Sequence, residues 1–244
     1  TLEKVPYRRF PKTDTARLKS LSTLLNNSDV YAAKSRFINM ELINTAKSLH
    51  DQLKTLSSQF MLSYEAQMRN YKTLAKPQKN MLTYVLHFVR VLSMSIERGE
   101  MKPAVLHDYY STHDADELIR QLHNVESAFQ LTPGIIEGEK RRIADGGRPI
   151  YNPTIGMVAT HFDIFSNLYK QQRILNDKAE RALNEVKKVR TEVDKLLVDI
   201  WNQVEQHFAE LPPETRFDQC RRYGIIYYYR KGETNEEKKQ EKKD

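Results

Sequence analysis

Residues 165–200 read FSNLYKQQRILNDKAERALNEVKKVRTEVDKLLVDI and decide the fold. Along this stretch, mostly apolar side chains recur at alternating steps of three and four residues, which is the heptad spacing of a coiled coil. One series advances by seven residues and comprises Phe165, Gln172, Ala179, Val186, Val193 and Ile200. A second series lies three residues further on and comprises Leu168, Leu175, Ala182, Val189 and Leu196. We expect one uninterrupted helix whose seam packs lengthwise against another helix.

The flanking residues set the bounds of this helix. Asn152 is a favourable capping residue and Pro153 suits a first helical turn, so the helix is predicted to begin there. The prolines of Leu211-Pro212-Pro213 predict that it ends near Glu210. Two partners remain open for its seam: an earlier helix of the same chain, or the same seam of a second copy. A membrane-bending surface is less favoured, because residues 170–195 carry only a weak basic excess.

A second long amphipathic pattern covers residues 35–75. Its apolar positions follow the 3.6-residue period of a straight helix. They are Ile38, Leu42, Leu49, Leu53, Leu56, Phe60, Tyr64, Met68, Tyr71 and Leu74. Lys76-Pro77 is predicted to end this helix, and Pro77 to open the next one, over residues 78–98. That next helix is apolar on more than one face, which predicts a central place in a bundle.

Shorter helices and one long loop complete the expected elements. The helices are predicted at residues 14–25, 103–111 and 115–130, with Thr13 or Asp14 capping the first and Asp114 the third. Residues 134–156 hold five of the eight glycines, which predicts an irregular connection with a helical turn or two around residues 135–144. The fold class that follows is an elongated all-α bundle with a small two-stranded β appendage.

The appendage is expected to join the two ends of the chain. Residues 225–230 read IIYYYR and have the highest β-propensity in the sequence. A lone strand is unstable, and the other extended segment is Val5 to Phe10, where Pro6 and Pro11 disfavour helix at the residues before them. We therefore predict that these two segments pair.

Basic side chains concentrate at these same ends. Residues 1–12 carry four basic side chains against one acidic, and residues 216–231 carry five against one. The predicted pairing gathers a basic and aromatic cluster that could stack bases and hold phosphates. Its members are Arg8, Arg9, Arg221, Arg222, Tyr227, Tyr229 and Arg230. The alternative is structural: the tyrosines pack on the bundle and the arginines cover them through cation–π contacts.

Side chains with catalytic or metal-binding potential have simpler explanations. The densest cluster comprises His107, Asp108, His113, Asp114, Asp116, Glu117 and His123. Its acids suit a helix cap and a first helical turn, and the paired Glu-x-x-His motifs of di-iron bundles are absent from the sequence. Cys220 has no histidine nearby in sequence, and Gly146-Gly147 belongs to no phosphate-binding fingerprint. We expect no catalytic residue, no bound metal or cofactor and no small-molecule substrate.

Composition excludes several classes of protein. Eight glycines in 244 residues are few for β-sandwiches, barrels or doubly wound folds. No stretch approaches the ~18 uncharged apolar residues of a membrane span. A single cysteine fits a reducing compartment, and we expect a cytoplasmic protein. There is neither a leader pattern nor an initiator Met, so Thr1 is expected to mark a trimmed or sub-cloned start. One elongated helical domain is predicted over residues 1–231, followed by a disordered Lys/Glu tail over 232–244.

Three segments of the C-terminal sequence carry a resemblance. The segments that carry the likeness are Trp201-Asn202-Gln203-Val204-Glu205, Leu211-Pro212-Pro213-Glu214 and the stretch from Tyr223 to Arg230. They are similar to the ends of uncharacterised bacterial all-helical proteins of unknown function. The resemblance implies a bacterial cytoplasmic helical protein and assigns no site residue.

These observations favour a non-catalytic structural or interaction protein. Its long helices are expected to bind a second copy or another helical protein. The alternative is a nucleic-acid-binding protein that uses the basic and aromatic cluster at the joined ends.

Overall fold

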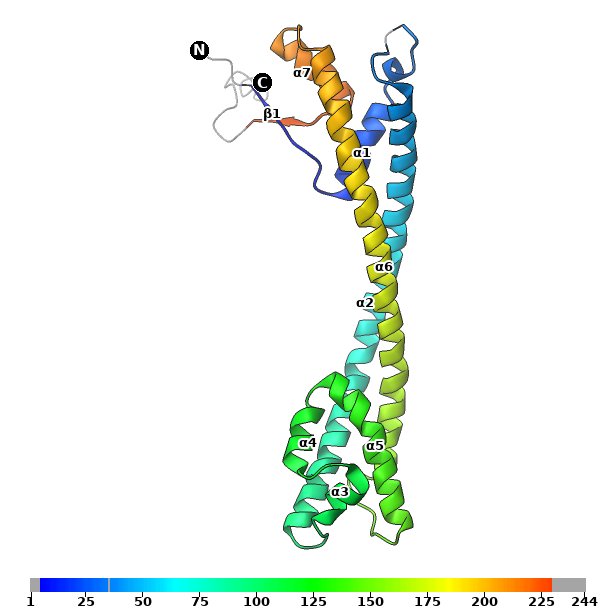
Figure 1. The fold of residues 1–244 in the computed structure, drawn as a ribbon, viewed down its shortest axis with the longest axis vertical. Helices are drawn as coiled ribbons and strands as arrows, with labels where there is room; N and C mark the ends of the chain where they lie inside the picture. The colour runs from blue at the N-terminus through cyan, green and yellow to red at the C-terminus, as the bar shows by residue number, and fades with distance from the viewer. Residues whose placement is uncertain (1–4, 35, 230–244) are drawn as a thin grey trace, which may run out of the picture. The chain divides into compact units, whose positions relative to one another are not determined.

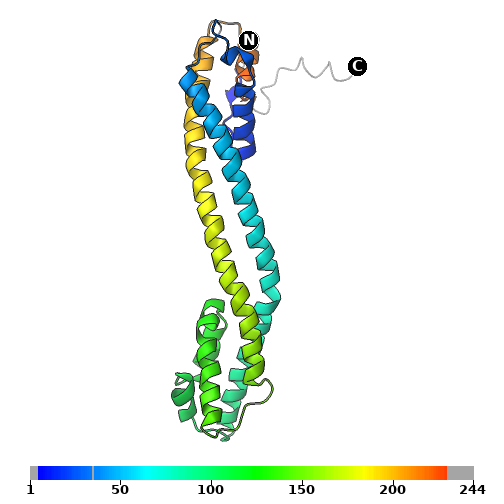
Figure 2. The same ribbon diagram turned by 90° about the vertical axis from the view of Figure 1, so that its right-hand side faces the viewer.

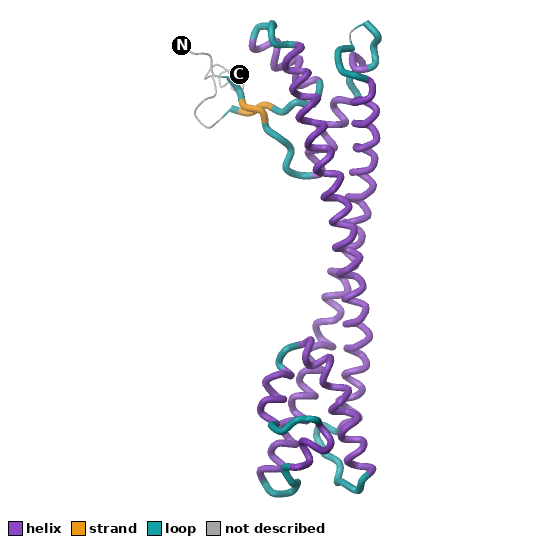
Figure 3. Tube along the Cα trace, viewed as in Figure 1, coloured by secondary structure: helices purple, strands orange, loops and turns teal. Residues whose placement is uncertain are grey.

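A computed structural model describes residues 5–34 and 36–229 (Figure 1). Within these residues the chain forms seven α-helices, one 3-10 helix (Ser28–Val30) and two short strands, which are orange in Figure 3. The strands β1 (Tyr7–Arg8) and β2 (Tyr227–Tyr228) pair antiparallel, with Tyr7 opposite Tyr228. The predicted all-α class and the predicted pairing of the chain ends are therefore confirmed.

Contacts divide the chain into two compact units. Unit 1 comprises Thr1–Leu62 and Glu180–Asp244, and unit 2 comprises Ser63–Ala179. Two long helices, α2 (Met40–Glu97) and α6 (Ile155–His207), contribute residues to both units. The single domain over residues 1–231 stays a prediction, and the predicted tail over 232–244 lies outside the described residues.

Unit 1 gathers the two ends of the chain around α1 (Asp14–Leu25) and α7 (Pro213–Arg222). The hydroxyl of Thr13 accepts a hydrogen bond from the Ala16 N–H at 3.2 Å. Of the two predicted capping residues, Thr13 and Asp14, Thr13 is therefore the cap of α1. Helix α1 lies alongside the first part of α2 and the last part of α6 (Figures 1 and 2). Their shared core includes Leu21 and Trp201, both fully buried.

Unit 2 packs three shorter helices on the remaining parts of α2 and α6. They are α3 (Ala104–Tyr110), α4 (Ala115–Leu122) and α5 (Val125–Ala144). The Asp114 side chain accepts from the Asp116 N–H at 2.9 Å, which confirms its capping role. Phe88 and Phe165 are completely buried in the core of this unit.

The predicted break at Pro77 is wrong, because α2 continues through this proline. The helix starts at Met40 and not near residue 35. The Asn39 side chain precedes this start and accepts a hydrogen bond from the Glu41 N–H. Leu74 and Met81 lie on either side of Pro77 and are 2% and 0% exposed. Burial of this continuous face stabilises the helix beyond what one proline costs.

The predicted helix over residues 115–130 is also wrong, since it divides at His123-Asn124. The Asn124 side chain accepts from the Ser127 N–H at 3.1 Å and starts α5 there. Helix α5 then runs through Pro133 and Gly134, so the long irregular connection shrinks to residues 145–154. The buried residues that hold this helix together recur at helical spacing: Ala128, Thr132, Ile135, Ile136, Gly138, Glu139 and Arg142.

Helix α6 begins two residues later than predicted, at Ile155 and not at Pro153. Asn152 has a φ of 54°, which is not the extended conformation of a capping residue. Thr154 takes that role, and its hydroxyl accepts from the Met157 N–H at 3.3 Å. The helix ends at His207, close to the predicted end.

Candidate functional site

The heptad seam of α6 is buried within its own chain. In unit 1, Val186, Val193 and Ile200 are 0% exposed, and their cluster includes Ile43 and Leu53 of α2. In unit 2, Phe165 is buried and Ala179 is 5% exposed. The second series is buried at Val189 and Leu196 and half-buried at Leu168, Leu175 and Ala182. A second copy therefore finds most of the predicted seam already covered.

Side-chain amides connect α2 and α6 in unit 2. Asn70 Nδ2 donates to Gln172 Oε1 at 2.8 Å, and Gln67 Nε2 donates to Asn176 Oδ1, also at 2.8 Å. Gln172 Nε2 donates to the same Asn176 oxygen at 2.7 Å. Asn70 and Gln172 are only 8% and 3% exposed. Buried amides of this kind fix the register of a helix pair, at a cost in stability.

A second series of largely apolar residues follows another side of α2 within unit 2, and its side chains are buried at one end of the series and exposed at the other. Steps of four and three residues connect Tyr64, Met68, Tyr71, Ala75, Gln78, Leu82, Val85, Val89 and Leu92. The last three of these are completely buried. At the other end Met68 is 40% exposed and Tyr71 is 53% exposed. We name the part from Tyr64 to Leu82 the outer α2 seam.

The outer α2 seam ends in a shallow hollow of about 370 Å³. Its lining includes Ala75, Gln78, Leu82 and Leu86, all from α2. The pattern over residues 35–75 places Tyr64, Met68 and Tyr71 in one apolar series with Leu74, yet these three side chains are exposed. The missed signal is a second series one residue earlier, Ser63, Gln67, Asn70 and Leu74, which lies toward α6.

The structure brings part of the predicted basic and aromatic cluster together: Arg8 lies opposite Tyr227 in the two strands, and the Arg221 guanidinium lies over the Tyr227 ring. One guanidinium nitrogen of Arg8 donates to Asn202 Oδ1 at 2.8 Å and to Glu205 Oε2 at 3.2 Å. The same guanidinium lies over the ring of Phe10, 5.1 Å from its centroid. Tyr227 donates its hydroxyl to Glu205 Oε1 at 2.7 Å, and burial raises the pKa of that hydroxyl. Arg8 and Tyr227 therefore bind the same carboxylate.

Arg221 and Arg222 of the cluster also have acidic partners. Arg221 pairs with Asp218 at 2.7 Å, and Arg222 pairs with Asp29 at 3.2 Å. Arg9 and Tyr229 are exposed. Arg230 lies outside the described residues. Neighbouring carboxylates offset much of the positive charge, which weakens the attraction for phosphates on which nucleic-acid binding depends.

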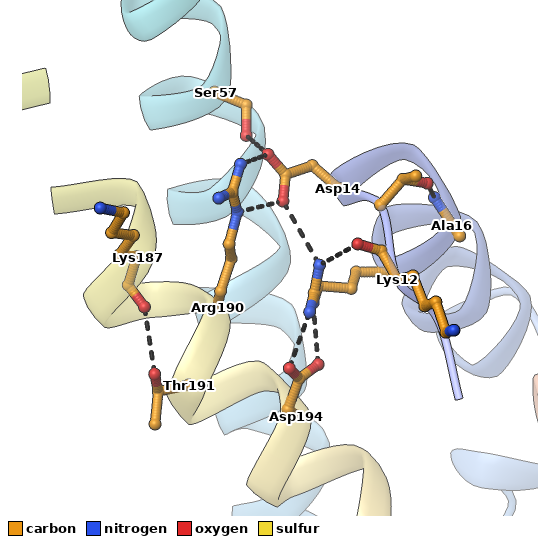
Figure 4. A network of polar contacts seen from close by, with 10 residues as sticks. Lys12, Asp14, Ala16, Ser57, Lys187, Arg190, Thr191 and Asp194 are labelled. Carbon is orange, nitrogen blue, oxygen red and sulfur yellow. Dashed lines mark hydrogen bonds and ion pairs between the residues drawn. The ribbon is translucent and has the colours of Figure 1, made fainter. Parts of the chain in front are cut away.

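A polar network that sequence reasoning missed joins three helices of unit 1 (Figure 4). Arg190 of α6 donates to both carboxylate oxygens of Asp14 at 2.6 Å. Ser57 of α2 donates to Asp14 at 3.2 Å. Arg17 of α1 donates twice to Asp194 at 2.8 Å. The hydrogen bond from Arg190 is the main reason that the pKa of Asp14 lies below its ordinary value.

This lowered pKa predicts a loss of stability in acid. The ion pair between Asp14 and Arg190 stabilises the fold fully above the pKa of Asp14 in the unfolded chain, which is about 4. This stabilisation is lost as pH falls through the lower pKa of Asp14 in the folded chain. We expect the Asp14→Asn variant to be about 1 kcal/mol less stable than wild type at neutral pH, and this difference to shrink below about pH 3. Urea unfolding followed by circular dichroism across this pH range measures it. Asp163→Asn, at an exposed position of α6, is the control. A difference that does not change with pH contradicts the prediction.

The cluster around His107 has local structural partners. The His107 ring stacks on His113 at 5.0 Å, and its Nδ1 lies 3.1 Å from Asp108. In the part of the chain that the structure describes, no group of three His, Cys, Asp or Glu side chains converges to hold a metal ion. Cys220 is fully buried, and burial raises the pKa of its thiol, so the reactive thiolate is disfavoured.

Comparison with known proteins adds no relative. No protein-family model, no curated protein and no solved structure matches this chain. Within residues 5–34 and 36–229, no helix combines the length and apolar character that crossing a bilayer requires.

Proposed function

We propose that this chain is a non-catalytic interaction protein that associates with a second copy of itself. The observation that carries the proposal is the outer α2 seam, where Met68 and Tyr71 are exposed while Asn70 is buried. An isolated two-helix pair gains most by placing its apolar residues inside and its amides outside. Here the Asn70 amide is buried beside Leu74 while Met68 and Tyr71 are exposed, which is expected where the outer surface is covered by a partner.

The composition of the outer α2 seam supports an interface. Tyrosine and methionine are enriched at protein–protein interfaces, whereas lysine and glutamate are depleted in their centres. Met68 adapts its shape to irregular neighbours, and Tyr71 offers a large apolar ring with a polar end. A heptad spacing suits a partner that is itself a helix.

Other features are consistent with a structural role in the bacterial cytoplasm. Asp114 caps a helix, and the buried Cys220 thiol is held in its less reactive form. A single buried cysteine suits the reducing conditions of a cytoplasm. The bacterial source in this proposal rests on the resemblance of residues 201–230.

The proposal predicts a homodimer in solution. Size-exclusion chromatography with multi-angle light scattering should give twice the chain mass of 28.7 kDa. The measurement should cover loading concentrations from ~5 to ~200 µM, because association depends on protomer concentration. A mass of one chain across the whole range contradicts self-association.

A further inference from the structure

We propose that the outer α2 seam pairs with the same seam of a second copy, in antiparallel orientation, about a two-fold axis beside Met68. This inference rests on the proposed self-association and adds the surface and the geometry. Four observations carry it: the exposure of the seam, the composition of the stretches outside the described residues, the charges that flank the seam, and the shape of the surface.

The seam is exposed at the residues that would lie at the centre of the pair. Met68 and Tyr71 are 40% and 53% exposed, although they continue the series that is fully buried at Val85 and Val89. The two parts of the series lie on one side of one helix. The described residues therefore cover the part of the series at Val85 and Val89, and they leave much of the part at Met68 and Tyr71 in contact with water.

The remaining stretches of this sequence are poor candidates to cover the seam. Residues 1–4, 35 and 230–244 include one aliphatic or aromatic side chain, Leu2. A heptad seam needs a partner with several apolar side chains at matching spacing. A second copy of α2 provides that spacing.

The flanking charges favour an antiparallel copy. Glu65 and Lys72 are seven residues apart, and both are exposed along the same edge of the seam. Glu65 also lies 3.7 Å from Arg69 of its own helix, an exposed pair that contributes little and leaves the Glu65 carboxylate accessible to a second cation. A two-fold axis midway between them, beside Met68, places Glu65 of each copy against Lys72 of the other. A parallel copy in register would set this edge against the other flank, where Gln67 and Leu74 lie, and would form no such pair.

The shape of the surface agrees with this geometry. The two Met68 side chains meet at the axis, and the rings of Tyr71 lie one turn away on either side. Further along, the hollow that begins at Ala75 offers space for side chains of the other copy. The pairing is isologous, so every contact is made twice and the assembly closes at two chains.

Charge reversal tests the antiparallel pairing. Glu65→Lys alone and Lys72→Glu alone each convert two attractive contacts into two repulsive ones, so each should raise the dimer dissociation constant about tenfold or more. An equimolar mixture of the two variants restores opposite charges at both contacts and should form a heterodimer. Light scattering, with one variant carrying a mass tag, resolves the three species.

Two further variants separate the surface from the fold. Met68→Glu places charges at the centre of the interface and should raise the dissociation constant at least about a hundredfold. Thr73→Glu lies on the opposite side of α2, five residues further on, and should leave the dimer unchanged. Because Met68 and Thr73 are both exposed, both variants should keep the wild-type helical circular dichroism.

The outcomes distinguish the proposals. A wild-type chain that is monomeric throughout overturns both self-association and this interface. A dimer that survives Met68→Glu leaves self-association standing and overturns the outer α2 seam as its surface. If Met68→Glu dissociates the dimer, but the mixture of Glu65→Lys and Lys72→Glu forms no heterodimer, the antiparallel geometry is overturned.

Discussion

Replacing Glu139 by alanine should lower the free energy of unfolding by about 3–5 kcal/mol. Glu139 is 0% exposed and accepts from Arg142 Nε at 2.7 Å and from the Ile150 N–H at 3.2 Å. The Tyr110 hydroxyl donates to the same carboxylate. This one side chain therefore connects α3, α5 and the residues before α6.

The cost arises from the groups that Glu139 leaves behind. Arg142 is 5% exposed and would keep its charge without a buried counter-ion, although it still donates to the Arg148 carbonyl at 2.6 Å. Burial, and next the hydrogen bond to Glu139, raise the pKa of Tyr110, so its hydroxyl keeps its proton and loses its acceptor in the variant. An unpartnered buried donor adds to the loss.

Urea unfolding by circular dichroism measures the total effect, and hydrogen exchange at the Ile150 amide reports the local one. Glu137→Ala is a matched control, because Glu137 is exposed two residues earlier on the same helix. It should change stability by less than about 0.5 kcal/mol. Equal losses for the two variants would show that the Glu139 network is not a stabilising feature.

The pairing of the chain ends could be predicted from sequence because local chemistry dictates it. The run from Ile225 to Arg230 favours a strand, and Pro6 and Pro11 keep the other end extended. The heptad series from Phe165 likewise predicted α6, because its spacing persists over several turns. In both cases the local preference and the tertiary packing agree.

The predictions that failed lie where packing overrides local preference. Pro77 and Pro133 signal helix ends, yet both lie inside helices whose buried faces continue past them. Because the region after Pro133 was predicted as irregular, there was no reason to expect buried charges at Glu139 and Arg142. The outer α2 seam was missed for a different reason: hydrophobic periodicity shows that Met68 prefers burial but not which neighbour buries it.

Replacing Gly224 by alanine is expected to cost about 3–5 kcal/mol, because two separate penalties combine. Gly224 has a φ of 85°, a conformation that is strained for residues with a Cβ. A Cβ at this position would also collide with the backbone carbonyl oxygen of Ser20 in α1. That close approach allows the Ser20 hydroxyl to donate to the Gly224 carbonyl at 2.8 Å. The collision would therefore push the chain before β2 away from α1.

Gly99→Ala separates the two penalties. Gly99 has a φ of 72°, yet nothing lies within 4 Å of the Cβ that alanine would add. Its cost should be the strain alone, about 1–2 kcal/mol, and the excess at Gly224 measures the collision with Ser20. Urea unfolding gives both values, and hydrogen exchange of the Arg9 amide, which donates to the Ile226 carbonyl at 2.8 Å, reports whether the chain ends separate. If the two variants lose the same stability, and the Arg9 amide stays protected in both, close packing against Ser20 is not what holds the C-terminal strand in place.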